Sequence, residues 1–223
     1  SKALTFNPTI FYYPSADSKL RFALSGTFED RLGGNLDAID DGESGANAYL
    51  QENNTNRLSY QLSYEKNWDE NRSFTVKNSL LSFDRTIQEP NLVFNGQQYA
   101  TFSEAAYSFG RDKSRWIVGT NLYSDNFTEE SGTNNKRNYE QITAGAFVQQ
   151  VEQVSETFSI ESGVRLDHNN DYGWFALPRV ALFYNPASKF SYRLGGGLGY
   201  KTPTIFSEDT ERMSFRGLDA SNL

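Results

Sequence analysis

The chain has 223 residues, enough for one β domain, and it contains no cysteine, which excludes disulfide bonds and thiolate metal sites. Its formal net charge of −7 argues against nucleic acid as a partner. Aromatic residues make up 15% of the chain, although hydrophobic residues are only 37% and the mean hydropathy is −0.64. This combination suits a sheet with one apolar, aromatic-edged face and one wetted face better than a packed soluble core.

Neither a membrane helix nor an export signal is visible in the sequence. A membrane helix needs ~20 apolar residues, whereas the apolar runs of this chain, such as Trp116-Ile117-Val118, are very short. The chain begins at Ser1 rather than at methionine. Because an exported protein needs a leader peptide, we expect a mature or truncated chain.

Apolar and polar residues alternate along the whole chain, which predicts β-strands. We expect about ten strands, each on the order of 10–14 residues long. The strand centres are expected, in chain order, near Phe6, Leu24, Tyr60, Leu80, Glu104, Gly119, Ala146, Val164, Val180 and Gly195. Strands of soluble proteins average only ~5–6 residues, so the expected lengths favour tilted membrane crossings.

The alternation divides the residues of these strands between two faces. The apolar face is predicted to carry Leu20, Phe22, Leu24, Leu58, Tyr60, Leu62, Phe158, Ile160, Val164 and Leu166. The polar face is predicted to carry Arg21, Glu29, Glu65, Glu161, Arg165, Asp167, Arg193 and Lys201. In a barrel the first face would meet lipid and the second would line the lumen.

Tight turns are expected to alternate with longer links. The turns are predicted at 14–17, 69–71, 111–113, 155–156 and 186–188, and the longer links at 31–54, 87–96, 129–137 and 168–173. Aromatic residues such as Trp68, Phe109 and Trp116 gather near the tight turns, as in the aromatic girdle of a membrane barrel. The sequence therefore predicts an all-β, antiparallel up-and-down meander, with residues 1–223 forming part of a transmembrane β-barrel. A soluble β-sandwich is the alternative.

Several runs in the last third carry a family resemblance: GVRLDH at 163–168, YG at 172–173, LPR at 177–179 and RLGGGLGYKTPTIFSE at 193–208. They resemble the barrel region of TonB-dependent outer-membrane receptors, especially Bacteroidetes-type receptors for ferric siderophores or colicins. The resemblance is loose over the whole chain and good over 139–215. It implies a barrel with about twice as many strands and a plug domain that fills the lumen. The chain is therefore expected to be a fragment that lacks the plug domain and the remaining strands.

The same resemblance implies roles for particular residues. Facing the lumen or the plug domain, we expect Arg165, Asp167, Arg179, Arg193, Gly195, Gly197 and Gly199. At the ligand mouth on the cell-surface rim, we expect Tyr200, Lys201, Arg212, Phe215 and Arg216. The implied partners are outer-membrane lipid, the protein's own plug domain, the TonB energy-coupling complex through that plug, and a ferric siderophore or similar ligand.

The glycine-rich run does not match a nucleotide-binding motif. A phosphate-binding loop would need glycine directly before lysine, but Tyr200 separates Gly199 from Lys201. The sixth position of a dinucleotide fingerprint that starts at Gly195 is also Tyr200. A bare glycine face instead allows close approach of another backbone, such as the plug, or marks a bend in the sheet.

Catalytic and metal sites are weakly supported. His168 is the only histidine, and its neighbour Asp167 should point to the opposite side of the strand, which is poor geometry for a Ser-His-Asp site. The acidic segment 37–43 offers oxygen ligands for calcium but lacks EF-hand spacing, so a solvated loop is the alternative. We therefore predict no enzyme activity, no metal site and no cofactor.

Three function classes remain open to the sequence. The favoured one is a receptor for active uptake of a scarce nutrient across the bacterial outer membrane, with a ferric siderophore as the expected ligand. The others are a non-transporting barrel, such as an adhesin or a structural protein, and an outer-membrane hydrolase. The single histidine argues against the hydrolase, and the resemblance to a larger receptor argues against the non-transporting barrel.

Overall fold

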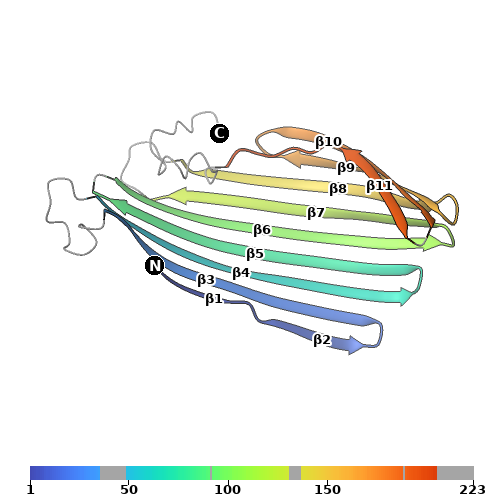
Figure 1. Cartoon of the computed structure of the whole chain (residues 1–223), viewed down its shortest axis with the longest axis horizontal. Helices are drawn as coiled ribbons and strands as arrows, with labels where there is room; N and C mark the ends of the chain where they lie inside the picture. The colour runs from blue at the N-terminus through green and yellow to red at the C-terminus, as the bar shows by residue number, and fades with distance from the viewer. Residues whose placement is uncertain (36–48, 91, 131–136, 188, 205–223) are drawn as a thin grey trace.

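The computed structural model describes residues 1–35, 49–90, 92–130, 137–187 and 189–204. These residues form one 11-stranded antiparallel sheet (Figure 1). Within these ranges there is no helix long and apolar enough to cross a bilayer. The strands are β1 Lys2–Phe6, β2 Thr9–Ser15, β3 Ser18–Gly34, β4 Leu50–Asp69, β5 Arg72–Glu89, β6 Leu92–Arg111, β7 Ser114–Glu129, β8 Tyr139–Gln153, β9 Phe158–Asn169, β10 Gly173–Ala187 and β11 Phe190–Gly197.

The sheet is a meander in which each strand from β3 onward pairs with its neighbours in sequence, so the predicted topology is confirmed. Every predicted strand centre lies inside an observed strand. The first predicted strand is divided into β1 and β2, which both pair with β3. The break falls at Asn7 and Pro8, where proline cannot donate a ladder hydrogen bond. The carbonyl of Pro8 still accepts a hydrogen bond from the Leu24 amide, so the two pieces stay aligned.

The strands meet in tight turns at one end of the sheet, as predicted. Asp112 adopts a left-handed conformation with a φ of 53° in the link between β6 and β7. In the link between β2 and β3, Asp17 pairs with Lys66 at 2.6 Å. Hydrogen bonds from Lys66 and Ser15 lower the pKa of Asp17 to about 2. We call this end of the sheet the turn end and the opposite end the loop end.

Two links that were expected to be long are short, and the prediction was wrong there. Glu89 pairs directly with Leu92, so only residues 90–91 join β5 to β6. The strands continue because Ile87 and Phe94 oppose each other and are buried with Phe127. The other link, between β9 and β10, is tightened by Asn169 Oδ1, which accepts hydrogen bonds from the amides of residues 171 and 172.

Of the remaining two long links, the one expected at 31–54 is shorter than predicted, whereas the one expected at 129–137 has the predicted length, because β7 ends at Glu129 and β8 begins at Tyr139. Strand pairing continues to Gly34 opposite Leu50, and β7 runs to Glu129. Residues 36–48 and 131–136, which contain the central parts of these links, lie outside the described residues.

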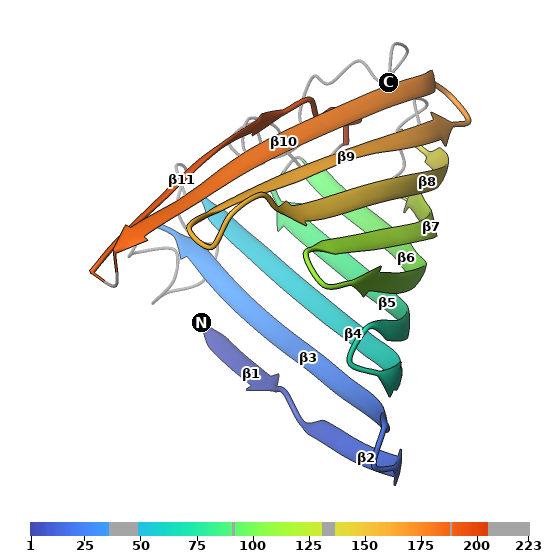
Figure 2. The same ribbon diagram turned by 90° about the vertical axis from the view of Figure 1, so that its right-hand side faces the viewer.

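The sheet curves into an open trough (Figure 2). Side chains converge on the concave face of a curved sheet and diverge on the convex face. The wholly buried side chains of Asp167 and Asn169 therefore place the polar set on the concave face, which we call the inner wall. The pairing of neighbouring strands aligns one row of residues across this wall: Lys77, Glu104, Asn121, Gly145 and Asp167.

The convex face carries the predicted apolar set, and its register confirms that assignment. Leu20, Phe22 and Leu24 lie directly opposite Tyr64, Leu62 and Tyr60. Val164 and Leu166 belong to the same face and are about half exposed. Toward the loop end this face becomes polar, and the residues that follow the apolar band are Asn56, Asp84, Gln97, Asn126 and Glu140. An apolar band with polar residues beyond it fits a wall that crosses a bilayer.

Candidate functional site

Three of the predicted site residues meet in one cluster on the inner wall. Asp167, which is fully buried, accepts hydrogen bonds from Arg165 Nε at 2.7 Å and Arg165 Nη2 at 2.6 Å. Tyr200 donates its hydroxyl to Asp167 Oδ2 at 3.1 Å. The alternation of β9 puts both charged residues on the same face, two positions apart. The bidentate contact neutralises a carboxylate that would otherwise be costly to bury.

Tyr200 reaches this cluster because the chain leaves the sheet after Gly197. Continued alternation beyond β11 would put Tyr200 on the apolar face with Tyr192 and Leu194, but the structure places it on the inner wall. Its ring stacks on Phe175 of β10, with centroids 3.9 Å apart and planes 4° from parallel. Burial and the neighbouring Asp167 raise the pKa of Tyr200. Gln141 also donates to the carbonyl of Pro203 at 3.4 Å, so the segment 198–204 is tied to the inner wall at two points.

Because Gly145 has no side chain, the side chain of Asp167 can occupy the space beside it. A Cβ atom at this position would lie 2.7 Å from Asn121 Oδ1 and still closer to Asp167 Oδ1. Asn121 is buried, and its Oδ1 has no hydrogen-bond partner among the residues that the structure describes. Glycine at 145 is therefore required by the close approach of two neighbouring side chains and not by an unusual backbone conformation.

A second group of predicted residues lies nearer the turn end. Arg179 and Arg193 both pair with Glu161, the latter at 3.5 Å. Gly195 and Gly197 lie opposite Ala181 and Arg179 in the register. A Cβ at Gly197 would lie 3.0 Å from the Pro178 carbonyl and the Arg179 Cβ, so this part of the wall is closely packed by its own neighbours.

The predicted rim residues are only partly described. Lys201 is exposed, and a Cβ at Gly199 would meet nothing within 4 Å. Arg212, Phe215 and Arg216 lie outside the described residues. The ligand mouth therefore stays a prediction, with Tyr200 and Lys201 as its described part.

Between the two groups the inner wall encloses a hollow of about 690 Å³. Charged side chains of both signs line it, among them Lys77, Glu104, Arg115, Arg165 and Arg179. Lys77 pairs with Glu104 at 2.9 Å across β5 and β6. Arg165 and Arg179 are likewise paired, with the carboxylates of Asp167 and Glu161, so most of these cations are compensated while the hollow still offers hydrogen-bonding groups to another polar surface.

Sequence reasoning missed a buried polar network nearer the loop end. Asp125 is 3% exposed and accepts two hydrogen bonds from Gln98 Nε2, at 2.8 and 3.0 Å, and one from Tyr123. Tyr139 accepts a hydrogen bond from the same Gln98 nitrogen and stacks on Phe127. The signal was present in the sequence, because Asn121, Tyr123 and Asp125 recur at a spacing of two.

The described residues place the single histidine away from the acidic groups of the inner wall. His168 lies on the convex face in edge contact with Trp174, with ring centroids 4.7 Å apart, so it points away from Asp167 as expected. Among the residues with described positions, no group of three or more His, Cys, Asp or Glu side chains could hold a metal ion. The acidic segment 37–43 lies outside them.

Comparison with protein families gives a match over nearly the whole chain. The profile of the family described as "TonB dependent receptor-like, beta-barrel" matches residues 2–212. Comparison with curated proteins gives no match. Receptors of this kind are not enzymes, in agreement with the sequence analysis.

Solved structures share the fold at low sequence identity. The siderophore receptor PirA from Pseudomonas aeruginosa matches with a TM-score of 0.65 and 13% identity, over 92% of this chain and 34% of its own. A mutant of the ferric enterobactin receptor PfeA from the same organism matches with a TM-score of 0.72 and 10% identity, over 90% and 33%. The alcaligin outer-membrane receptor FauA from Bordetella pertussis matches with a TM-score of 0.66 and 10% identity, over 83% and 33%.

The chain spans about a third of the length of each of these structures. Its family match covers nearly all of its own residues, and its apolar band is that of a wall facing lipid. The chain is an outer-membrane β-barrel chain of bacteria, and it belongs to the TonB-dependent receptor-like β-barrel family.

Proposed function

We propose that this chain forms part of the wall of an outer-membrane receptor that takes up a ferric siderophore. The observation that carries the proposal is the family match over residues 2–212, reinforced by three solved siderophore receptors with the same fold. A chain of this family needs a lumen with a polar wall, and the inner wall has one. The non-transporting barrel gains no support from any structural feature.

The proposed partners divide between the two faces of the sheet. The convex face meets membrane lipid. The inner wall, with its hollow and the ion pair between Lys77 and Glu104, would pack against a plug domain of the same protein. The energy-coupling complex would act on the receptor through that plug. Because the charges of the wall are largely paired with one another, water-bridged and hydrogen-bonded contacts would dominate over strong ionic attraction.

Uptake of labelled iron tests this function. A strain with the receptor gene deleted should lose energy-dependent accumulation of radioactive iron from one siderophore of a panel, and the restored gene should recover it. The control is a strain in which the energy-coupling complex is inactivated, which should lose the same uptake. Undiminished accumulation of every siderophore in the deletion strain would exclude the proposed function.

The rim proposal predicts a salt-dependent effect of Lys201. Reversing its charge with Lys201→Glu should weaken binding of an anionic ferric chelate about two- to tenfold at low salt, as expected for an exposed charge. The effect should shrink at high salt. The matched control is Lys189→Glu, because Lys189 is exposed at the turn end of the sheet. Equal affinities of the wild type and Lys201→Glu at both salt concentrations would remove this residue from the ligand mouth.

A further inference from the structure

The chain turns off the sheet where its sequence would still allow a strand. Strand β11 ends at Gly197, yet Leu198 and Tyr200 continue its alternation of apolar residues with glycine and lysine. The amide of Leu198 still donates to the carbonyl of Pro178 on β10 at 3.0 Å. The chain then crosses the inner wall, and we call residues 199–204 the strap.

The departure of the strap leaves one edge of β10 uncovered. Strand β10 pairs with β9 from Gly173 onward but with β11 only from Arg179 onward. Alternate residues of a strand direct their N–H and C=O groups to the same side. Because the carbonyl of Pro178 faces β11, the main-chain groups of Trp174 and Ala176 face that side too. Among the residues that the structure describes, none pairs with them there.

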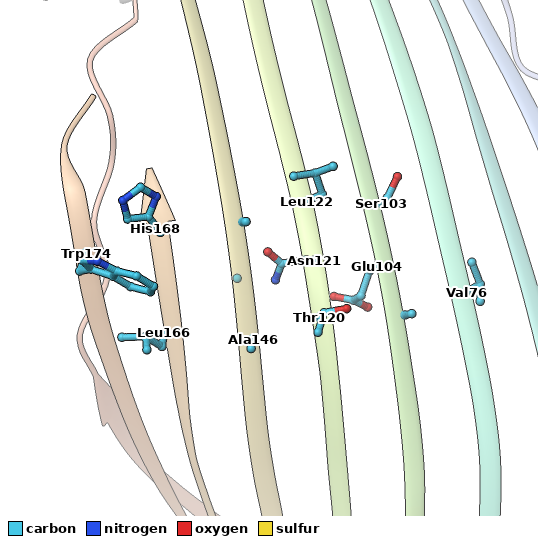
Figure 3. Close-up of a pocket in the computed structure, with 13 residues that line it drawn as sticks. Val76, Ser103, Glu104, Thr120, Asn121, Leu122, Ala146, Leu166, His168 and Trp174 are labelled. Atoms are coloured by element: carbon cyan, nitrogen blue, oxygen red, sulfur yellow. The ribbon is translucent and has the colours of Figure 1, made fainter. Parts of the chain in front are cut away.

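The uncovered edge lies partly within the apolar band of the convex face. Ala176 is opposite Leu166, one of the apolar residues of that band. The indole of Trp174 leans toward Leu166 and His168 of β9, away from the uncovered edge (Figure 3). Hydrocarbon offers no water to satisfy free N–H and C=O groups, and an open edge invites pairing with another strand. A strand partner for this edge is therefore favoured.

The strap has the sequence and the length to cover this edge. Extended in the register of β11, it would bring Tyr200 opposite Ala176 and Thr202 opposite Trp174. The amides of both strap residues would face β10, as the last amide of the ladder does. Pro203, which has no amide hydrogen, would turn its nitrogen away from β10, as proline in an edge strand must. The short side chain of Ala176 leaves room for the ring of Tyr200 on the convex face.

The contacts that hold the strap on the inner wall compete with this pairing. Tyr200 donates to Asp167 at 3.1 Å and stacks on Phe175. Gln141 donates to the carbonyl of Pro203 at 3.4 Å. In the extended position Tyr200 would lie on the convex face, so the strap cannot make both sets of contacts at once. Each position satisfies hydrogen-bonding groups that the other leaves open, which is the arrangement of a two-state switch.

We propose that the strap exchanges between two positions in the folded receptor, a closed one held by Tyr200 on Asp167 and an open one that extends β11 along β10. Opening removes a donor from Asp167 Oδ2 and uncovers the ring of Phe175. The strap thereby controls whether this cluster of the inner wall can bind a polar group in the lumen. The exchange depends on the position of the wall in the membrane and on no property of the ligand.

Disulfide formation between introduced cysteines tests the open position. The chain contains no cysteine, so both thiols of a pair are introduced. The Cα atoms of Thr202→Cys and Trp174→Cys would lie about 5.5 Å apart in the open position, within the range of a disulfide. The reference pair, Leu182→Cys with Leu194→Cys, occupies an equivalent place in the existing ladder.

Oxidation of the full-length receptor in lipid vesicles with copper phenanthroline measures a rate for each pair, and single-cysteine variants control for other thiols. The open-position pair should bond more slowly than the reference pair, because the strap is mostly closed. Tyr200→Phe keeps the stacking ring but removes the hydroxyl, so it should accelerate the open-position pair about three- to tenfold, the effect of one hydrogen bond. The matched control Tyr192→Phe removes an exposed hydroxyl from the convex face of β11 and should change neither rate.

Three outcomes would overturn the proposal. No bond in the open-position pair, with a normal bond in the reference pair, would show that the strap never pairs with β10. Equal rates for the two pairs, unaffected by Tyr200→Phe, would show a permanently extended strand. A slow rate that Tyr200→Phe leaves unchanged would mean that Asp167 does not hold the strap closed. The reference pair also reports whether Tyr200→Phe is folded, because its disulfide needs the ladder between β10 and β11. None of these outcomes depends on siderophore uptake.

Discussion

Replacing Val164 by arginine is expected to destabilise the folded barrel by about 2–4 kcal/mol in a lipid bilayer. Val164 lies centrally in β9 on the convex face and is 45% exposed. In a membrane this exposed surface meets hydrocarbon, and burying a guanidinium there removes it from water without a partner. Reversible unfolding of the receptor in lipid vesicles, with urea as the denaturant, measures the free energy of unfolding.

The matched control is Gln149→Arg, which places the same side chain on the inner wall. Gln149 pairs with Gly163, the residue next to Val164, and it lines the inner hollow. Gly163 itself is unsuitable, because a Cβ there would lie 3.0 Å from the Val148 carbonyl and would add strain of its own. The control should cost less than about 1 kcal/mol. Equal costs for the two variants would contradict the assignment of the convex face to lipid.

Much of the fold was predictable because a β-barrel wall has only one layer. In such a wall every strand must show a period of two, and neighbours in sequence pair through short turns. The strand centres followed from that period alone. The same period misplaced the links at 87–96 and 168–173, because polar residues continue to alternate where strands extend beyond the membrane. Ile87 and Phe94, which lie opposite each other, gave an apolar sign that β5 and β6 continue.

The candidate site was predictable only where it follows the strand period. Arg165 and Asp167 were placed correctly on one face, because their spacing of two fixes their direction. Alternation alone would put Tyr200 on the apolar face, but its position depends on where β11 leaves the sheet. That departure is stabilised by the stacking on Phe175, a contact across 25 residues of sequence that alternation cannot reveal. Asp125 and its partners were overlooked, although their spacing carried the same signal as Asp167.

Gly145→Val is expected to destabilise the receptor by about 1–3 kcal/mol, the usual cost of overpacking a filled site. The register places Gly145 directly between Asn121 and Asp167 on the inner wall. Its added side chain would occupy the space now taken by Asp167 Oδ1 and Asn121 Oδ1. Displacing the carboxylate would also weaken its bidentate contact with Arg165 and its hydrogen bond from Tyr200.

Gly33→Val separates this packing effect from the general effect of removing a glycine. Gly33 also lies in a strand on the inner wall, and a Cβ there meets no described residue within 4 Å. Valine has a higher strand propensity than glycine, so this control should be neutral or slightly stabilising. Both variants are measured by the same urea unfolding of the receptor in lipid.

A double-mutant cycle then identifies the group that valine displaces. If Asp167 is that group, Gly145→Val should cost much less in an Asp167→Gly background, because the atom in its way is gone. The coupling free energy should be on the order of 1 kcal/mol or more, well above the few tenths expected for independent sites. Additive costs would mean that the valine is accommodated without moving Asp167. In that case the glycine is not what allows the carboxylate to be buried beside Arg165 and Tyr200.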